Sequence, residues 1–192
     1  MRDYTEKVIS SQRIYEGRII NLRIDSVELP DGSTGRREVV EYAGAVAVVA
    51  VNEKRETYLV RQYRHAVGKT LLEIPAGKIE PGEDIYSCAR RELLEETGYT
   101  ATNIKKIISF FSTPGFTTEK LHVFLAGGLR LEKQNLDCDE FIDVVTVSLE
   151  RALDMIWTGE ICDAKSVAGI LAAHNMIEKN RGSIESFFNG RC

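Results

Sequence analysis

Seven consecutive apolar residues, from Ala45 to Val51, constrain the fold more than any other stretch of this sequence. A strand with one face in water alternates apolar and polar side chains, whereas a strand covered on both faces reads as a continuous apolar run. The run therefore predicts a central strand in a sheet that carries other elements on both faces. Further apolar or alternating runs predict more strands. They lie at residues 57–61, 104–111, 121–126 and 142–147.

Three stretches carry the signals of a helix start, in which an Asp or Ser side chain can accept hydrogen bonds from the free N–H groups of the first turn. The predicted helices run over residues 85–96 after Asp84, from Ser148 to about Gly159, and from Asp163 to about Lys179. Gly98 favours the left-handed conformation that ends the first of them. Strands mixed with three helices indicate an α/β or α+β architecture.

The first forty or so residues are more polar than the Val-rich stretch that follows. Apolar alternation from Val8 to Glu28, and again from Arg36 to Tyr42, predicts strands on either side of the turn at residues 30–32. We therefore expect an N-terminal antiparallel β appendage. The expected divisions are a β-strand region over residues 1–43, the main domain over 44–180 and a C-terminal tail over 181–192.

Composition narrows the classes of partner. No apolar run approaches the roughly 18 residues of a membrane-spanning helix, and a net charge of −4 gives no whole-molecule attraction to nucleic acid. The N-terminus lacks the apolar core of a secretory signal, and the four cysteines show neither metal-ligand nor paired spacing. We expect a soluble protein in a reducing cytoplasm, with neither nucleic acid nor membrane as its partner.

The helix predicted at residues 85–96 places Glu92, Glu95 and Glu96 on one face, at spacings of three and four. Like charges there cost about 0.2–0.5 kcal/mol a pair, and anions in a last turn face the negative end of the helix dipole. Side chains placed against the local preferences of a helix usually have a function, and a bound Mg²⁺ or Mn²⁺ would compensate these negative charges. A solvated acidic face partnered by Arg90 and Arg91 explains the charge pattern equally well.

A longer pattern surrounds these glutamates. Gly77 is followed after five residues by Glu83, after seven more by Arg91-Glu92-Leu93, after one by Glu95-Glu96 and after one by Gly98-Tyr99. The pattern resembles the signature box of the Nudix hydrolases at every defined position. This resemblance covers about residues 45–179, and it implies a Nudix-type mixed β-sheet sandwiched between helices.

The resemblance also implies a Mg²⁺ cluster, with Mn²⁺ as a substitute. Its ligands would be Glu92, Glu95, Glu96 and the backbone carbonyl of Ala76. Glu140 matches a position that supplies another metal-binding carboxylate. Cations suit the chemistry, because they neutralise phosphoryl oxygens and lower the pKa of a bound water.

Four other box residues are expected to support the site. Gly77 and Gly98 are best explained by backbone conformation. Arg91 is expected to pair with the box carboxylates and to fix their rotamers. Glu83 is expected either to support the ligands or to be one of them.

Pro114 lies fifteen residues beyond Tyr99, a spacing that resembles the Nudix enzymes that cleave ADP-ribose. The stretches 59–64 and 72–77 resemble the segment before the box in ADP-ribose and ADP-sugar pyrophosphatases, in which an arginine matching Arg64 contacts phosphate. The plainer interpretations are a strand-connecting turn at Pro114 and a surface arginine at Arg64. The resemblance implies substrate contacts by Arg37, Glu38, Arg61, Arg64, Pro114 and Gly115.

Residues 36–38 resemble the segment that reaches the nucleotide in this subgroup, commonly from the partner subunit of a dimer. The resemblance therefore implies a homodimer with exchanged N-terminal strands.

Cys138 is the main departure from the pattern, since many relatives carry a glutamate there that is a candidate general base. A thiol is a poor substitute at neutral pH, because its unperturbed pKa is about 8.5. The general base is therefore open. The candidates are Glu140, Glu119, Asp137, Asp139 and a box glutamate, Glu95 or Glu96 being preferred within the box.

We expect Mg²⁺-dependent hydrolysis of ADP-ribose to AMP and ribose 5-phosphate, by attack of water on a phosphorus of the diphosphate. One alternative substrate is another nucleoside diphosphate sugar or a nucleoside triphosphate, because the box recognises the diphosphate and not its substituents. Another alternative is a non-catalytic sensor that binds ADP-ribose. The intact box glutamates disfavour the sensor, and Cys138 keeps it open.

Overall fold

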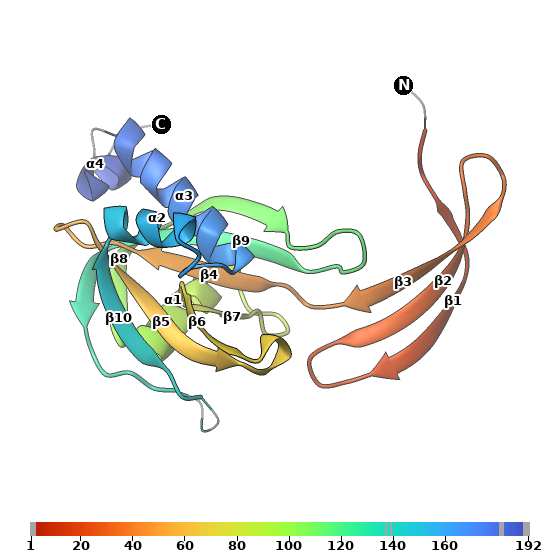
Figure 1. The fold of residues 1–192 in the computed structure, drawn as a ribbon, viewed down its shortest axis with the longest axis horizontal. Coiled ribbons are helices and arrows are strands. Elements are labelled where there is room, and N and C mark those ends of the chain that lie inside the picture. Colours follow the sequence, from red (N-terminus) through yellow and green to blue (C-terminus); the bar gives the residue numbers. More distant parts are fainter. Residues whose placement is uncertain (1–2, 137, 139, 181–182, 190–192) are drawn as a thin grey trace. The chain divides into compact units, whose positions relative to one another are not determined.

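The computed structural model describes residues 3–136, 138, 140–180 and 183–189. The chain divides into two compact units, one of residues 1–44 with 111–120 and one of residues 45–110 with 121–192 (Figure 1). No helix in the described part of the chain has the length and apolar character needed to cross a lipid bilayer.

The first unit contains an antiparallel sheet of three strands in the order β1-β2-β3. The strands are β1 (Lys7–Glu16), β2 (Asn21–Glu28) and β3 (Thr34–Glu41). Gly32 closes the turn between β2 and β3 with φ at +83°, and its N–H donates to the Leu29 carbonyl. The predicted N-terminal antiparallel strands are confirmed.

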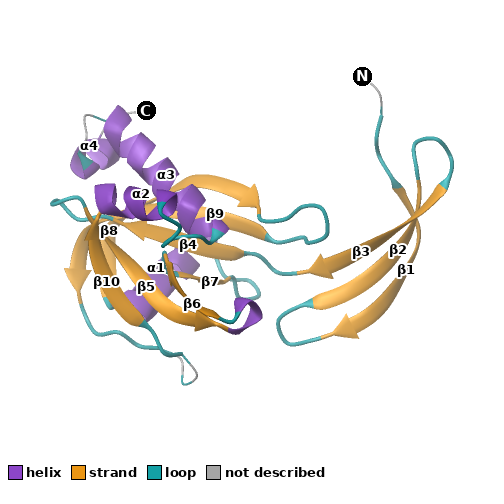
Figure 2. Ribbon diagram, viewed as in Figure 1, coloured by secondary structure: helices purple, strands orange, loops and turns teal. Residues whose placement is uncertain are grey.

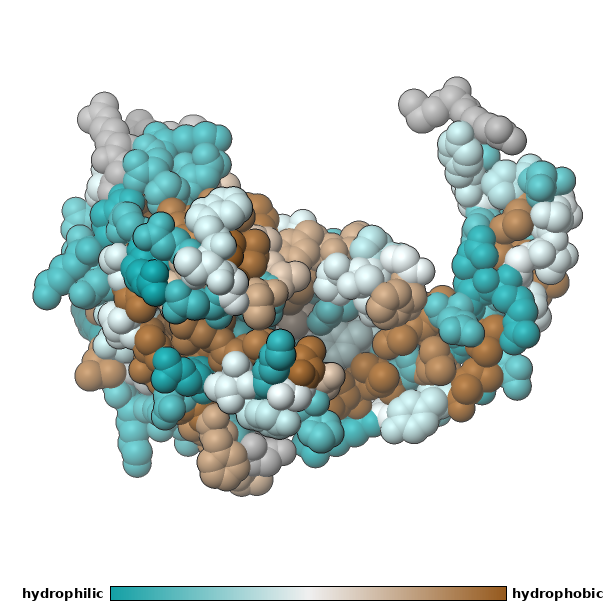
Figure 3. Space-filling view, in the orientation of Figure 1, coloured by the Kyte–Doolittle hydropathy of each residue, from teal (hydrophilic) through white to brown (hydrophobic). Residues whose placement is uncertain are grey.

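Apolar side chains of this sheet lie on its surface. β1 is exposed along its whole length, and the side chains of Val8, Ile9, Ile14 and Tyr15 are exposed. Figure 3 shows hydrophobic residues on the surface of the N-terminal strands. Exposed apolar area of this kind is typical of an interaction surface.

The second unit is built on two sheets (Figure 2). One has the order β7-β4-β9-β8 and the other the order β10-β5-β6. Their bounds are β4 (Ala45–Ala50), β5 (Glu56–Arg64), β6 (Lys69–Glu73), β7 (Ala76–Lys78), β8 (Tyr99–Phe111), β9 (Lys120–Leu131) and β10 (Asp143–Ser148). β4 pairs in parallel with β9 and antiparallel with β7, so the sheet is mixed.

Helices cover both faces of β4, all of whose residues are buried. Ala47 and Val49 pack in a cluster with residues of α2 (Leu149–Trp157), α3 (Ala164–Lys179) and α4 (Ile184–Asn189). Val46, Val48 and Ala50 pack in a second cluster with α1 (Ile85–Thr97). The predicted central strand, and the α+β sheet sandwiched between helices, are confirmed.

The described residues contain elements that the sequence did not predict. A short 3₁₀ helix, η1 (His65–Val67), connects β5 to β6, and β6 and β7 are too short to show a period. β8 already begins at Tyr99, because a polar stretch hides its first residues. The three predicted helices are confirmed as α1, α2 and α3. A fourth, α4, was not predicted; it lies in the expected tail and buries Ile184 and Phe187.

Candidate functional site

Local sequence signals place α1. The Asp84 carboxylate accepts hydrogen bonds from the N–H groups of Tyr86 and Ser87 at 3.0 Å each, which satisfies donors of the first turn. Gly98 ends the helix with φ at +75°, and its N–H donates to the Leu94 carbonyl at 2.8 Å. Between these ends a stripe of fully buried residues fixes the rotation of α1 about its axis. The stripe consists of Cys88, Ala89 and Leu93.

The carbonyls at the C-terminal end of α1 accept from the segment that follows β9. The backbone N–H of Asn135 donates to the Glu95 carbonyl at 3.2 Å, and the Gln134 side chain donates to the Glu96 carbonyl at 2.6 Å. These bonds satisfy groups that a helix leaves unpaired. They also fix the segment that leads toward Glu140.

β7 approaches α1 closely at Gly77. A Cβ atom on Gly77 would lie 2.0 Å from the Glu92 carboxyl group, so any side chain would displace that carboxylate. The φ angle of Gly77 is not in the left-handed region. The expectation that backbone conformation explains Gly77 was therefore wrong; glycine is needed here because the carboxylate occupies the space of a side chain.

Two of the box glutamates are buried. Glu92 is 8% exposed and Glu96 is 3% exposed. Loss of water on burial raises the pKa of Glu92 to about 6 and that of Glu96 to about 8. The Ala76 N–H donates to Glu96 Oε2 at 2.9 Å and opposes the rise.

Glu140 lies close enough to this pair for its negative charge to raise the pKa of both Glu92 and Glu96. Cys138 lies in an exposed turn. Asp137 and Asp139, the other candidates in that segment, lie outside the described residues.

Arg91 joins three carboxylates. Its guanidinium donates to both oxygens of Glu83 at 2.9 Å, to Glu92 Oε1 at 2.6 Å and to Glu95 Oε2 at 2.9 Å. The bond with Arg91 is the largest influence on Glu83, whose pKa falls to about 2. Glu83 is therefore ionised and fully engaged by Arg91, which favours a supporting role over metal ligation.

The donor chemistry fits a hard divalent cation. Among the described residues no three His, Cys, Asp or Glu side chains already meet as a metal-ligand group. Arg91 holds Glu92 and Glu95, and the Ala76 N–H holds Glu96. Carboxylate oxygens are nevertheless the ligands that Mg²⁺ and Mn²⁺ prefer, and a cation would stabilise the ionised forms of buried groups whose pKa is raised.

Arg64, at the end of β5, belongs to the same region. Its positive charge lowers the pKa of Glu96, so it acts on the buried carboxylates. Its side chain is oriented by Glu73, to which Nε and Nη2 donate at 2.9 and 2.7 Å. Arg61 lies three residues earlier on the same strand and is exposed, so it projects from the opposite face and is not brought together with Arg64.

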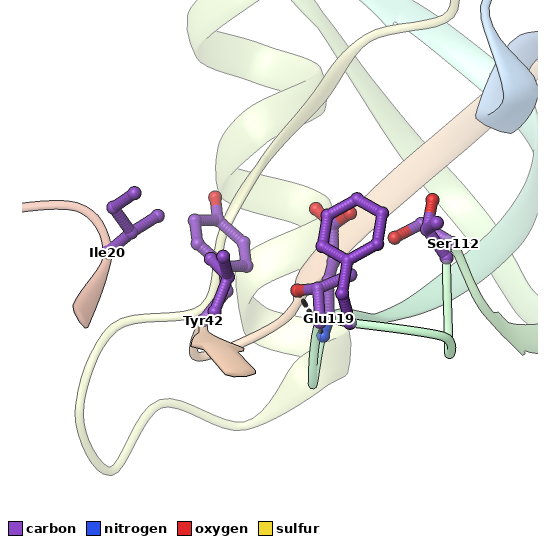
Figure 4. A pocket seen from close by; sticks show the side chains of 8 residues that line it. Ile20, Tyr42, Ser112 and Glu119 are labelled. Carbon is purple, nitrogen blue, oxygen red and sulfur yellow. Dashed lines mark hydrogen bonds between the residues drawn. The ribbon is translucent and has the colours of Figure 1, made fainter. Parts of the chain in front are cut away.

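The other predicted substrate residues belong to the first unit. Arg37 is paired there with Glu6, and its neighbour Glu38 is exposed on β3. Pro114 and Gly115 form an exposed turn. That turn adjoins an open pocket of about 380 Å³, whose wall carries aromatic, aliphatic and hydroxyl side chains and the half-buried Glu119 (Figure 4). The lining residues are Ile20, Val40, Tyr42, Ser112, Thr113, Phe116, Thr117 and Glu119.

Sequence reasoning assigned no role to Glu73, Gln134 or Lys165. Glu73 gave a signal, since it interrupts the apolar run of residues 71–74. Gln134 and Lys165 gave none, because each contacts a partner far away in the sequence.

Comparison with known proteins agrees with this geometry. Residues 41–168 match the NUDIX domain family, and residues 6–40 match the nucleoside diphosphate sugar hydrolase N-terminal domain. The chain belongs to the Nudix hydrolase family, whose enzymes generally use divalent metal ions.

Particular relatives are similar over most of the chain. The ADP-ribose pyrophosphatase of Bacillus subtilis (strain 168) is 45% identical over 172 residues, which cover 88% of this chain and 93% of that protein. The methanol dehydrogenase activator of Bacillus methanolicus is 44% identical over 170 residues, or 87% and 91% of the two chains. A crystal structure of an ADP compounds hydrolase shares the fold, with a TM-score of 0.81 at 21% identity over 91% of this chain and 95% of that one. The resemblance to the Nudix family is confirmed.

Proposed function

We propose that this protein hydrolyses the diphosphate linkage of ADP-ribose, giving AMP and ribose 5-phosphate, with Mg²⁺ as its cofactor and Mn²⁺ as a substitute. The observation that carries the proposal is the group of buried glutamates on α1, which Arg64 adjoins. The similarity to the Bacillus subtilis ADP-ribose pyrophosphatase supports the choice of substrate.

The metal ligands that we propose are the side chains of Glu92, Glu95, Glu96 and Glu140 and the carbonyl of Ala76. When bound, the cation would neutralise phosphoryl oxygens and lower the pKa of a water molecule.

The chain's own groups prepare the site for this chemistry. Arg91 fixes Glu92 and Glu95, and the Ala76 N–H fixes Glu96. Arg64 presents a guanidinium edge, which suits a phosphate because it can donate two parallel hydrogen bonds. We assign proton transfer from water to Glu95, Glu96 or Glu140, whereas Glu83 is occupied by its two bonds with Arg91.

The nucleotide end of the substrate is assigned to Arg37, Glu38, Pro114 and Gly115, and Arg61 is assigned a weaker contact because it is exposed on the opposite face of its strand from Arg64. We further propose a cytoplasmic homodimer with exchanged N-terminal strands. The exposed apolar side chains of β1 support an interface at this sheet.

The test is Mg²⁺-dependent release of AMP from a panel of ADP-ribose, other nucleoside diphosphate sugars, dinucleotides and nucleoside triphosphates. We expect ADP-ribose to be preferred, and we expect EDTA or Glu96→Gln to abolish turnover. Preference for another compound would replace the substrate and keep the site. Binding of ADP-ribose with every compound left intact would instead support the sensor and refute the hydrolase.

A further inference from the structure

Next to Arg64 the structure contains a chain of four charged groups whose signs alternate. Lys165 Nζ lies 2.8 Å from Asp163 Oδ2 and 2.5 Å from Glu73 Oε2. Glu73 in turn accepts from Arg64 through both of its oxygens. The order is therefore Asp163, Lys165, Glu73 and Arg64, with the arginine at the end that is most exposed.

Of the two inner members of this chain, Glu73 is buried and Lys165 is half-buried. The Glu73 side chain is 1% exposed and that of Lys165 is 14% exposed, whereas that of Arg64 is 41% exposed. Burying charges costs free energy, and apolar residues of similar volume often stabilise a fold as well as a buried ion pair does. Stability alone is therefore a weak explanation for this arrangement.

Contacts with α3 hold both the Glu73 side chain and the backbone next to it. The Ile74 N–H, next to Glu73, donates to the Ser166 hydroxyl at 2.8 Å, and Ser166 follows Lys165 in the first turn of α3. Asp163 is the N-cap of the same helix. Glu73, the last residue of β6, and Ile74 after it thus bond to the adjacent residues Lys165 and Ser166 of α3, which fixes Lys165 against Glu73.

The pairing leaves part of Arg64 available. A guanidinium has five N–H donors, and Glu73 accepts from Nε and Nη2. In the part of the chain that the structure describes, no hydrogen bond from Nη1 is recorded. The bidentate contact with Glu73 therefore orients the arginine while leaving an edge for an anionic ligand.

We propose that Glu73 and Lys165 are positioning residues, which hold the Arg64 guanidinium in the orientation that receives the substrate's diphosphate. Lys165 partly neutralises the negative charge of Glu73. Glu73 can therefore orient Arg64 without fully neutralising the charge of the arginine. This inference rests on the proposed function, since it assigns Arg64 to the diphosphate. Preorganisation of this kind raises affinity by removing the cost of ordering a long side chain on binding.

The experiment compares Arg64→Ala, Glu73→Gln, Lys165→Met and the double variant Arg64→Ala/Lys165→Met. The readouts are the dissociation constant of inorganic pyrophosphate by calorimetry with Mg²⁺, and kcat and KM for ADP-ribose. We expect Lys165→Met to weaken pyrophosphate binding about tenfold, as the loss of about one charge-assisted hydrogen bond would. We expect no further weakening in the double variant relative to Arg64→Ala, because Lys165 acts through Arg64.

Arg55→Met is the matched control, since Arg55 also bridges two carboxylates, those of Glu150 and Glu178. It should lower thermal stability and leave pyrophosphate binding unchanged. Lys165→Arg should restore binding, and Lys165→Gln replaces Lys165→Met where the latter does not fold.

Equal effects of Lys165→Met with and without Arg64 would overturn the positioning role, as would unchanged pyrophosphate binding in Glu73→Gln and Lys165→Met. A wild-type protein that binds no pyrophosphate would overturn it too. If the expected pattern is found while ADP-ribose is left intact, the positioning role is supported and the proposed substrate alone is refuted.

Discussion

At the scale of single residues, the site depends on close contacts that leave no room for change. Gly77 faces the Glu92 carboxyl group, and one arginine guanidinium bonds to Glu83, Glu92 and Glu95. These contacts fix the positions of the carboxylate oxygens. Substitutions here should therefore reduce activity more than they reduce the stability of the fold.

Gly77→Ala should reduce kcat at least tenfold, because a Cβ atom 2.0 Å from the Glu92 carboxyl group displaces that carboxylate. Steady-state hydrolysis and thermal unfolding measure the two effects. Gly169→Ala is the control, since its Cβ would lie 2.8 Å from Ile74 Cδ1 in the core and away from the glutamates. It should change stability and spare kcat. Equal losses of kcat in both variants would contradict this role of Gly77.

The ion pair between Glu83 and Arg91 predicts a dependence of stability on pH. The pKa of Glu83 is about 2 in the fold, below its ordinary value of 4.5. Its contribution is therefore complete above pH 4.5 and is lost as the pH falls toward 2. Glu83→Gln should lower the free energy of unfolding by about 1 kcal/mol at pH 7. This difference from the wild type should vanish as the pH falls to about 2.

Urea unfolding at several pH values measures this difference. Glu160→Gln is the control, because Glu160 pairs with Arg151 on an exposed surface and should contribute little. A difference for Glu83→Gln that stays constant down to pH 2 would rule out the ion pair as its source.

At the scale of elements, the sequence predicted what local chemistry determines. Asp84, Ser148 and Asp163 each begin a helix as expected, because a cap depends on neighbouring residues alone. The burial of β4 on both faces likewise follows from its own composition.

The rest of the site depends on contacts between distant residues. Lys165 bonds to Glu73 across 92 residues, and Gln134 bonds to Glu96 across 38. No spacing rule within a helix or strand encodes such pairs. The same reason explains why Gly77 was assigned to backbone conformation, since its constraint comes from a side chain on another element.

The bond from Gln134 to the end of α1 gives a prediction at this scale. Gln134→Ala should cost about 1 kcal/mol of stability and reduce kcat a few-fold, because it frees the Glu96 carbonyl and loosens the segment near Glu140. Asn180→Ala is the matched control, since its side-chain amide donates to the Met176 carbonyl at the end of α3. We expect unfolding measurements to show similar losses of stability in the two variants. Rate measurements should show a larger loss of kcat in Gln134→Ala than in Asn180→Ala. Equal kcat in the two variants would show that Gln134 does not support the site.

At the scale of the whole molecule, the two units differ in how they bury apolar side chains. The unit that contains β4 has two clusters of fully buried residues, whereas β1 in the other unit is exposed along its length. The sequence predicted β1 by its alternation, but alternation cannot show whether the apolar face is covered. The proposed homodimer would cover it.

A charge on β1 should therefore shift the protein from dimer to monomer. Val8 and Ile9 are 60% and 59% exposed, and the pairing of β1 with β2 is irregular at Ile9. Val8→Lys and Ile9→Lys place a charge at two neighbouring positions of this strand, and light scattering of the two variants shows which position a partner covers. The variant that dissociates should also lose activity, because Arg37 and Glu38 would no longer reach the partner's site. Trp157→Lys, on α2 and 76% exposed, should remain dimeric. A monomeric wild type, or two variants that both remain dimeric, would refute an interface at this sheet.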